Sequence, residues 1–140
     1  MVKKSGQRVR YAVVGLGHIA QVAVLPAFAH ATANSILAAL VSDNRTKLNQ
    51  LSRRYRVQHT YAYDEYEDCL NSGEIDAVYI ALPNSLHAEY SIRAARAGIH
   101  VLVEKPMAVT EKQCLAMIRA AQRHRVKLMV AYRLHFEATN

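Results

Sequence analysis

Short apolar runs alternate with amphipathic segments along most of the chain. Runs such as Tyr11-Ala12-Val13-Val14, which lack polar alternation, are typical of strands buried on both faces of a parallel sheet. The predicted strands cover residues 10–14, 35–41, 60–61, 77–82, 100–103 and 127–131. Helical spacing of apolar residues predicts helices over 18–30, 45–55, 64–71, 86–97 and 110–124. This alternation predicts a doubly wound parallel sheet, an α/β Rossmann fold in three layers, over residues 1–131.

Turn-forming and capping residues separate these elements. Gly73 and Gly98 follow the third and fourth predicted helices, where glycine commonly ends a helix. Thr110 and Gln113 have the spacing of a capping box at the start of the last helix. Pro26 is expected to kink or stop the first helix.

The stretch Gly15-Leu16-Gly17-His18-Ile19-Ala20 lies between the first predicted strand and the first helix. A strand, a glycine turn and a helix in this order are typical of a dinucleotide-binding unit. Gly15 permits the tight turn, Gly17 lets a pyrophosphate approach the backbone, and Ala20 takes the place of the third glycine. We expect Gly15, Gly17, His18 and Ile19 to contact the cofactor, with the pyrophosphate at the helix N-terminus.

The charge of the chain suggests a different partner. The formal net charge is +7, and the basic residues cluster at 53–56 and 119–127. Such a charge is compatible with nucleic-acid binding. No helix-turn-helix, zinc-finger or ribonucleoprotein motif accompanies the clusters, so solvated helix faces explain them better.

The cysteines and the lengths of the apolar runs bear on the cellular compartment of the protein. Cys69 and Cys114 have no CxxC spacing, and we expect both to be buried thiols of a cytoplasmic protein. No apolar run is long enough to span a membrane, no export signal is evident, and we expect no metal site.

Three later segments resemble the family of glucose–fructose oxidoreductase and inositol dehydrogenase. Glu104-Lys105-Pro106 looks like its EKP motif, and Ala81-Leu82-Pro83-Asn84-Ser85-Leu86-His87 is similar to its loop after the fourth strand. The blocks 94–103 and 132–137 extend the resemblance over nearly the whole chain. The resemblance implies a nicotinamide-dependent oxidoreductase acting on a sugar or cyclitol.

The same resemblance assigns the nicotinamide side of the site. It implies that Lys105 is catalytic and lies beside the reacting carbon, where an ammonium group can donate to a carbonyl or alcohol oxygen. Family members commonly have a cis bond at the position of Lys105-Pro106. The cofactor contacts that it implies on this side are Leu82, Pro83, Asn84, His87, Glu104 and Lys105. His87 is equally compatible with an ordinary position at a helix N-terminus.

The end of the second predicted strand should bind the adenosine ribose. Asp43 could accept hydrogen bonds from both ribose hydroxyls, which favours NAD. Ser42 and Lys47 resemble the phosphate-binding pair of glucose–fructose oxidoreductase, and Arg45 adds a second cation. We therefore favour NADP as the cofactor and keep NAD as the alternative.

The family normally continues into a second domain that binds the substrate. We expect residues 132–140 to be the exit segment toward such a domain, which is absent from these 140 residues. The chain alone should then bind dinucleotide, self-associate through the exposed interdomain face and be catalytically incomplete. The alternatives are a non-catalytic nucleotide-binding or redox-sensing module and, as a minor one, a nucleic-acid binder.

Overall fold

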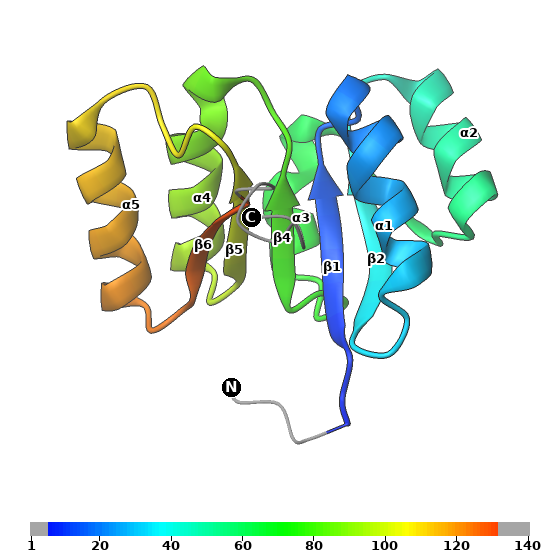
Figure 1. The fold of residues 1–140 in the computed structure, drawn as a ribbon, viewed down its shortest axis with the longest axis horizontal. Coiled ribbons are helices and arrows are strands. Elements are labelled where there is room, and N and C mark those ends of the chain that lie inside the picture. The colour runs from blue at the N-terminus through cyan, green and yellow to red at the C-terminus, as the bar shows by residue number, and fades with distance from the viewer. Residues whose placement is uncertain (1–5, 132–140) are drawn as a thin grey trace, which may run out of the picture.

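A computed structural model describes residues 6–131, which form one parallel sheet covered by helices on both faces (Figure 1). The sheet order is β3-β2-β1-β4-β5-β6, and every neighbouring pair is parallel. The strands are β1 (Val9–Val14), β2 (Ser35–Val41), β3 (His59–Tyr61), β4 (Ala77–Ile80), β5 (His100–Glu104) and β6 (Leu128–Ala131). All six predicted strands are confirmed, with ends that differ by at most two residues.

The helices divide between the two faces of the sheet. On one face, α1 (Leu25–His30) and α2 (Arg45–Tyr55) pack on the half formed by β1 to β3 (Figure 1). On the other face lie α3 (Tyr66–Leu70), α4 (His87–Arg96) and α5 (Glu111–Arg123). Short helical turns η1 (Ala20–Val24), η2 (Tyr63–Glu65) and η3 (Asn84–Leu86) precede α1, α3 and α4. The predicted three-layer Rossmann fold is confirmed, and no helix within residues 6–131 could cross a membrane.

The two faces of the sheet bury alternate residues of the same strands. In β1, Val13 packs in the cluster beneath α1 and α2, whereas Ala12 and Val14 pack beneath α3 to α5. All three side chains are fully buried. A strand that is apolar at consecutive positions is therefore required here, because both of its faces lie in the core.

The first helical segment differs from the prediction at Pro26. Pro26 was expected to kink or stop the helix, and the helix continues through Pro26 to His30, so Pro26 does not stop it. The irregularity lies one turn earlier, where η1 is a π-helix whose last bond runs from the Leu25 N–H to the Ala20 carbonyl. Pro26 then occupies the first turn of α1, where a backbone N–H is not needed.

Capping side chains define the starts of two helices. At α2 the cap is Asn44, whose Oδ1 accepts from the Lys47 N–H at 3.0 Å. At α5 the Thr110 hydroxyl accepts from the Gln113 N–H at 3.1 Å, as predicted, and the Gln113 side chain accepts from the Val109 N–H. These contacts satisfy N–H groups that have no partner inside the helix.

A cation–π stack joins α3 to α4. The Arg93 guanidinium lies 4.9 Å from the ring centre of Tyr66 and 4.7 Å from that of Tyr90, and it donates to both carboxylate oxygens of Glu67. The Tyr66 hydroxyl donates to the Tyr90 carbonyl at 2.9 Å. The stack fixes α4 against its neighbour, and through α4 it fixes the loop before that helix.

The tightest backbone approach near the glycine turn involves Gly15. Its φ is +95°, and a Cβ placed there would lie 2.8 Å from the carbonyl oxygen of Ala81. Gly15→Ala should therefore lower the free energy of unfolding by about 3 kcal/mol or more, since the strain of a positive φ adds to a backbone clash. Urea denaturation followed by circular dichroism measures the loss.

Gly98→Ala is the matched control. Gly98 has a φ of +77°, but a Cβ there would meet nothing within 4 Å. The control should lose only about 1–2 kcal/mol, from the backbone conformation alone. Equal losses in the two variants would show that the approach to Ala81 carries no cost.

Candidate functional site

The candidate site lies where β1 and β4, which are neighbours in the sheet, continue into loops that lead to opposite faces. Parallel sheets bind ligands at such a switch point, outside the carboxyl ends of the strands. The Gly15 N–H donates to the Val41 carbonyl at 2.9 Å, and the Ala81 N–H donates to the Val14 carbonyl at 2.8 Å. These bonds hold the two loops to the sheet at the point where they separate.

The glycine turn forms one wall of the site. Gly17 and His18 are exposed, and a Cβ on Gly17 would meet no protein atom within 4 Å. Ala20 is fully buried against the core, which is consistent with the need for a small side chain at this position. The open space above Gly17 is where the sequence places the pyrophosphate.

Gln21 supports this turn, although it was not among the predicted site residues. Its side-chain amide donates to the Leu16 carbonyl at 2.8 Å, and its own N–H donates to the Gly17 carbonyl at 3.2 Å. The two bonds fix the turn from the first residues of the helical segment. A glutamine that follows the glycine pattern directly is the one signal that could have indicated it.

Two of the polar residues after β2, Ser42 and Asp43, accept hydrogen bonds from backbone N–H groups. Ser42 is buried, and its hydroxyl accepts from the Asn44 N–H at 3.1 Å. Asp43 Oδ1 accepts from the Tyr63 N–H at 2.8 Å, so this carboxylate is turned toward the loop after β3. Arg45 is exposed and Lys47 is half-buried, both in the first turn of α2.

Tyr63 is a second residue near the candidate site that was not among the predicted site residues. Burial raises the pKa of its hydroxyl, and a hydrogen bond with Ser42 partly offsets that rise. Tyr63 thus contacts Ser42 through its side chain and Asp43 through its backbone. Both contacts join the ends of β2 and β3.

The carboxyl ends of β1, β4 and β5 enclose a cavity of about 360 Å³. We refer to it as the crevice. Its lining consists of Ile19, Ala81, Leu82, Asn84, His87, Glu104 and Lys105. Six of these seven are predicted site residues, which the fold brings together from three separate segments, and Pro83 lies beside them on the exposed loop.

Glu104 and Lys105 differ in their surroundings. Glu104 is 8% exposed, and its carboxylate accepts a hydrogen bond from the Tyr79 hydroxyl at 2.5 Å. Lys105 is exposed, and the Lys105-Pro106 bond is cis, as the resemblance implies.

His87 is the first residue of α4 and is fully buried. Its Nε2 lies 2.7 Å from the Leu82 carbonyl oxygen, and its Nδ1 lies 2.8 Å from the Pro106 carbonyl oxygen. The sequence allowed two interpretations of His87, an ordinary position at a helix N-terminus and a position at the candidate site. The structure agrees with both, because His87 is the first residue of a helix and also lines the crevice.

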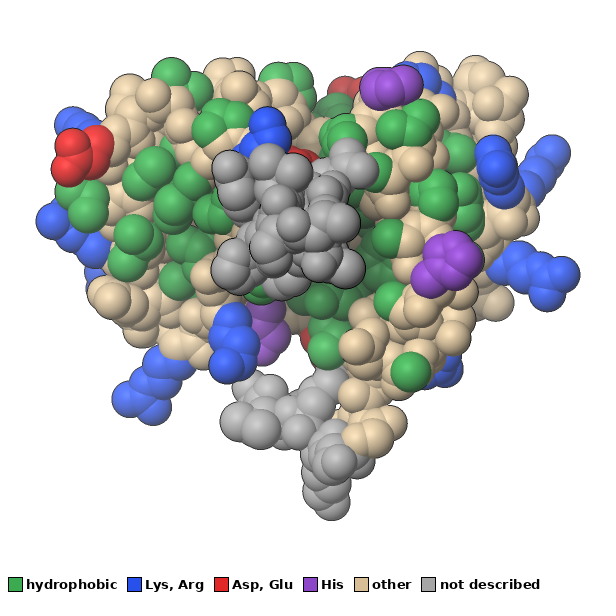
Figure 2. All heavy atoms as spheres, viewed as in Figure 1, with side chains coloured by type: hydrophobic (Ala, Val, Ile, Leu, Met, Phe, Trp, Pro, Cys, Tyr) green, Lys and Arg blue, Asp and Glu red, His purple; other side chains and the backbone are tan. Residues whose placement is uncertain are grey.

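A second, more open cavity lies on the sheet face that carries α1. It has a volume of about 450 Å³, and we refer to it as the groove. It is lined by Tyr11, Val22, Ala23, Val24, Ala27, Phe28, Ala31, Ser35, Tyr79, Leu102 and Glu104. Hydrophobic side chains are numerous on this face (Figure 2), and among the described helices only α1 and α2 lie over it (Figure 1).

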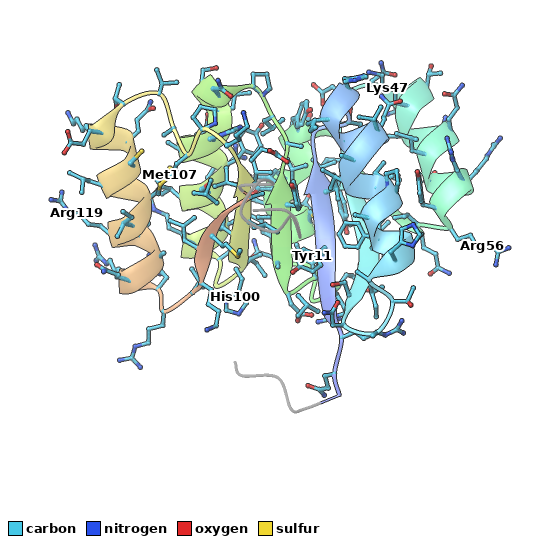
Figure 3. The ribbon with its side chains drawn as sticks, viewed as in Figure 1. Tyr11, Lys47, Arg56, His100, Met107 and Arg119 are labelled. Carbon is cyan, nitrogen blue, oxygen red and sulfur yellow. The ribbon has the colours of Figure 1, made fainter. Side chains whose placement is uncertain are left out.

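The basic clusters do not form one surface. Arg56 lies at the far end of α2 from Lys47, and Arg119 projects from α5 on the opposite side of the molecule (Figure 3). Among the described residues, no group of three or more His, Cys, Asp or Glu side chains could hold a metal ion.

The prediction of two buried thiols is half wrong. Cys69 is buried, and burial raises its pKa to about 12. Cys114 is only half-buried, because the first turns of α5 are partly uncovered. Residues 132–140, the predicted exit segment, lie outside the described residues.

Comparisons with known proteins agree with this geometry. Residues 9–132 match the model of the Gfo/Idh/MocA oxidoreductases, described as an oxidoreductase family with an NAD-binding Rossmann fold. The D-xylose 1-dehydrogenase [NADP(+)] of Haloarcula marismortui is 33% identical over 129 residues, which are 92% of this chain and 36% of that protein.

Solved structures agree as well. The aldose-aldose oxidoreductase of Caulobacter crescentus, complexed with glycerol, is 42% identical with a TM-score of 0.89, over 94% of this chain and 40% of that one. KijD10, a 3-ketoreductase from Actinomadura kijaniata in complex with TDP-benzene and NADP, is 30% identical with a TM-score of 0.86, over the same shares. The chain thus spans well under half the length of these relatives.

Gly17→Val tests whether the glycine turn binds dinucleotide. The Cβ of the valine would meet no described protein atom within 4 Å, and its side chain would stand where the pyrophosphate is expected, so binding should be lost while the fold is kept. Calorimetric titration with NAD and NADP measures the first effect, and the thermal unfolding midpoint of the same variant controls for the second. Unchanged affinity in a folded variant would end the assignment of the turn.

Proposed function

Because the chain belongs to the Gfo/Idh/MocA oxidoreductase family, we propose that its 140 residues are the cofactor-binding part of a sugar or cyclitol oxidoreductase. The observation that carries this proposal is the crevice, where Ile19, which follows the glycine turn, meets the Leu82–His87 loop and Lys105. Calorimetric titration of the purified chain with NAD and NADP in parallel tests it. Binding of neither would overturn it.

Each part of the dinucleotide has residues that suit it. The pyrophosphate would lie over Gly15 and Gly17, beside the N–H groups that open the helical segment through His18 and Ile19. The adenosine ribose would lie at the end of β2, and the nicotinamide would enter the crevice. Bound there, the nicotinamide supplies or accepts the hydride.

The contacts at the end of β2 favour NADP over NAD. Asp43 already accepts from the Tyr63 N–H, which leaves its carboxylate poorly placed to take both ribose hydroxyls. Arg45 and Lys47 lie in the first turn of α2, where two cations and the helix N-terminus suit a 2′-phosphate. The Ser42 hydroxyl, which accepts from the Asn44 N–H, contributes by fixing the loop. NAD is the alternative, with Asp43 released toward the ribose.

Lys105 is proposed as the catalytic residue. Its ammonium group can donate to the oxygen of a carbonyl or alcohol held beside the nicotinamide. Asn84 and the carboxylate of Glu104, which Tyr79 holds, would fix the nicotinamide end. Lys105 is exposed in the described chain, and water reduces the strength of any charge–dipole contact that it makes.

The groove is proposed as an interdomain face. Its lining is largely apolar, and Val22 and Met129 on this side of the molecule are 55% and 47% exposed. Relatives with more than twice the length have further chain available to cover such a face. In the 140 residues alone, self-association would bury it.

We place the protein in the cytoplasm, because the cysteines at 69 and 114 are both free.

Lys47→Ala tests the choice of cofactor. If Lys47 contacts a 2′-phosphate, the variant should lose about 1.5–3 kcal/mol of NADP binding and much less of NAD binding. Titration calorimetry with both cofactors measures this. Lys112→Ala is the matched control, because Lys112 is an exposed lysine in the first turn of another helix. Equal losses for both cofactors would instead favour Asp43 and NAD.

The isolated chain should bind cofactor without turning over a substrate. Hydride transfer requires the substrate carbon to be held next to the nicotinamide, and such positioning supplies much of the rate. Absorbance at 340 nm with a panel of sugars and cyclitols should show no sustained reduction of NAD or NADP. Light scattering after size-exclusion chromatography should show self-association.

Sustained turnover by residues 1–140 would contradict this prediction of an incomplete enzyme. A strictly monomeric chain would contradict the assignment of the groove. Cofactor binding without any activity in a longer form of the protein would favour the redox-sensing alternative. Affinity for duplex DNA that falls steeply with salt, together with no dinucleotide binding, would favour the nucleic-acid alternative.

A further inference from the structure

We propose that His87 is a positioning residue whose imidazole ties the loop after β4 to the loop that carries Lys105. Nε2 lies 2.7 Å from the Leu82 carbonyl oxygen and Nδ1 lies 2.8 Å from the Pro106 carbonyl oxygen. The inference deepens the proposed function, because it assumes that the nicotinamide end of a dinucleotide enters the crevice.

The sheet itself does not join these two loops. The pairing of β4 with β5 ends at Ile80 and Val103, and both loops begin just beyond those residues. Past that point, His87 bridges the two backbones with one ring. It comes from the start of α4, which the Arg93 stack holds against α3.

The surroundings of His87 distinguish positioning from direct contact with a ligand. The side chain is fully buried, and each ring nitrogen has a protein carbonyl as its partner. A carbonyl oxygen only accepts, so the ring donates to one loop in either neutral tautomer and to both loops when it is protonated. No ring nitrogen is left to face a bound molecule.

Two amide variants separate the two contacts. The amide nitrogen of an asparagine lies as far along the side chain as Nδ1, whereas that of a glutamine lies as far as Nε2. His87→Asn should keep the contact to Pro106, and His87→Gln should keep the contact to Leu82. His87→Leu keeps volume without either donor.

Ser91→Ala is the control for a polar deletion in the same helix. Ser91 is buried in α4, and its hydroxyl has no hydrogen-bond partner among residues 6–131. Its loss should change neither ligand binding nor loop exchange.

Hydrogen–deuterium exchange of the unliganded chain gives the first readout. Amides of residues 105–110 should exchange about tenfold faster in His87→Leu and His87→Gln, and at the wild-type rate in His87→Asn, because a lost contact of this kind corresponds to about one decade. The pattern requires no cofactor, so it distinguishes this proposal from the proposed function. Equal rates in His87→Gln and His87→Asn would overturn the inference.

Ligand binding gives the second readout. NADP should bind about tenfold more weakly to His87→Leu. Adenosine 2′,5′-bisphosphate, which lacks the nicotinamide half, should bind as tightly as to the wild type. A general structural defect would weaken both ligands and would overturn the inference.

Each remaining outcome is also decisive. If His87→Leu does not fold, the two amide variants still test the proposal, because each keeps one donor. His87→Gln should then show both the faster exchange of residues 105–110 and the weaker binding of NADP. Failure of the wild type to bind either ligand would defeat the proposed function, while the exchange pattern would still decide the role of His87 in joining the loops.

Discussion

The close approach of Gly15 to the Ala81 carbonyl is the constraint on which the site depends. A Cβ on residue 15 would stand 2.8 Å from that oxygen, so β1 and β4 can separate at this distance only with glycine there. Because the strands separate immediately after their last ladder bonds, the crevice opens directly above the sheet. The glycine turn and the Leu82 loop both take their positions from this point.

Above the sheet, side chains rather than ladder bonds hold the backbone. Gln21 donates to the Leu16 carbonyl, His87 bridges the Leu82 and Pro106 carbonyls, and Asn44 caps α2. Gln21 and Asn44 each satisfy a backbone group that regular secondary structure leaves unpaired, and the His87 ring satisfies one carbonyl in either neutral tautomer and both when it is protonated. A small number of polar side chains therefore fix the backbone above the sheet, and these three lie at or near the starts of helical segments.

The sequence predicts the sheet well because its strands are apolar at consecutive positions and its turns carry glycine. It predicts the glycine turn for the same reason, since that turn is a local pattern with a local physical cause, whereas Glu104 and Lys105 were indicated only by the resemblance of Glu104-Lys105-Pro106 to a family motif. The contact of Tyr79 with Glu104 spans 25 residues, and that of Asp43 with Tyr63 spans 20, so no local pattern reveals them. Pro26 does not stop the first helix, because it occupies the first turn of α1, after a π-helical turn that the apolar pattern does not reveal.

Glu104 connects the two cavities of the molecule. It lines the crevice together with Lys105, and it also lines the groove together with Tyr79, whose hydroxyl holds its carboxylate. Where the described residues leave the groove open, water reaches one side of this pair and weakens the field that acts in the crevice. Any surface that covers the groove would exclude that water and strengthen the field in the crevice. The glycine turn does not line the groove, so such a surface would change the electrostatics of the crevice more than those of the turn.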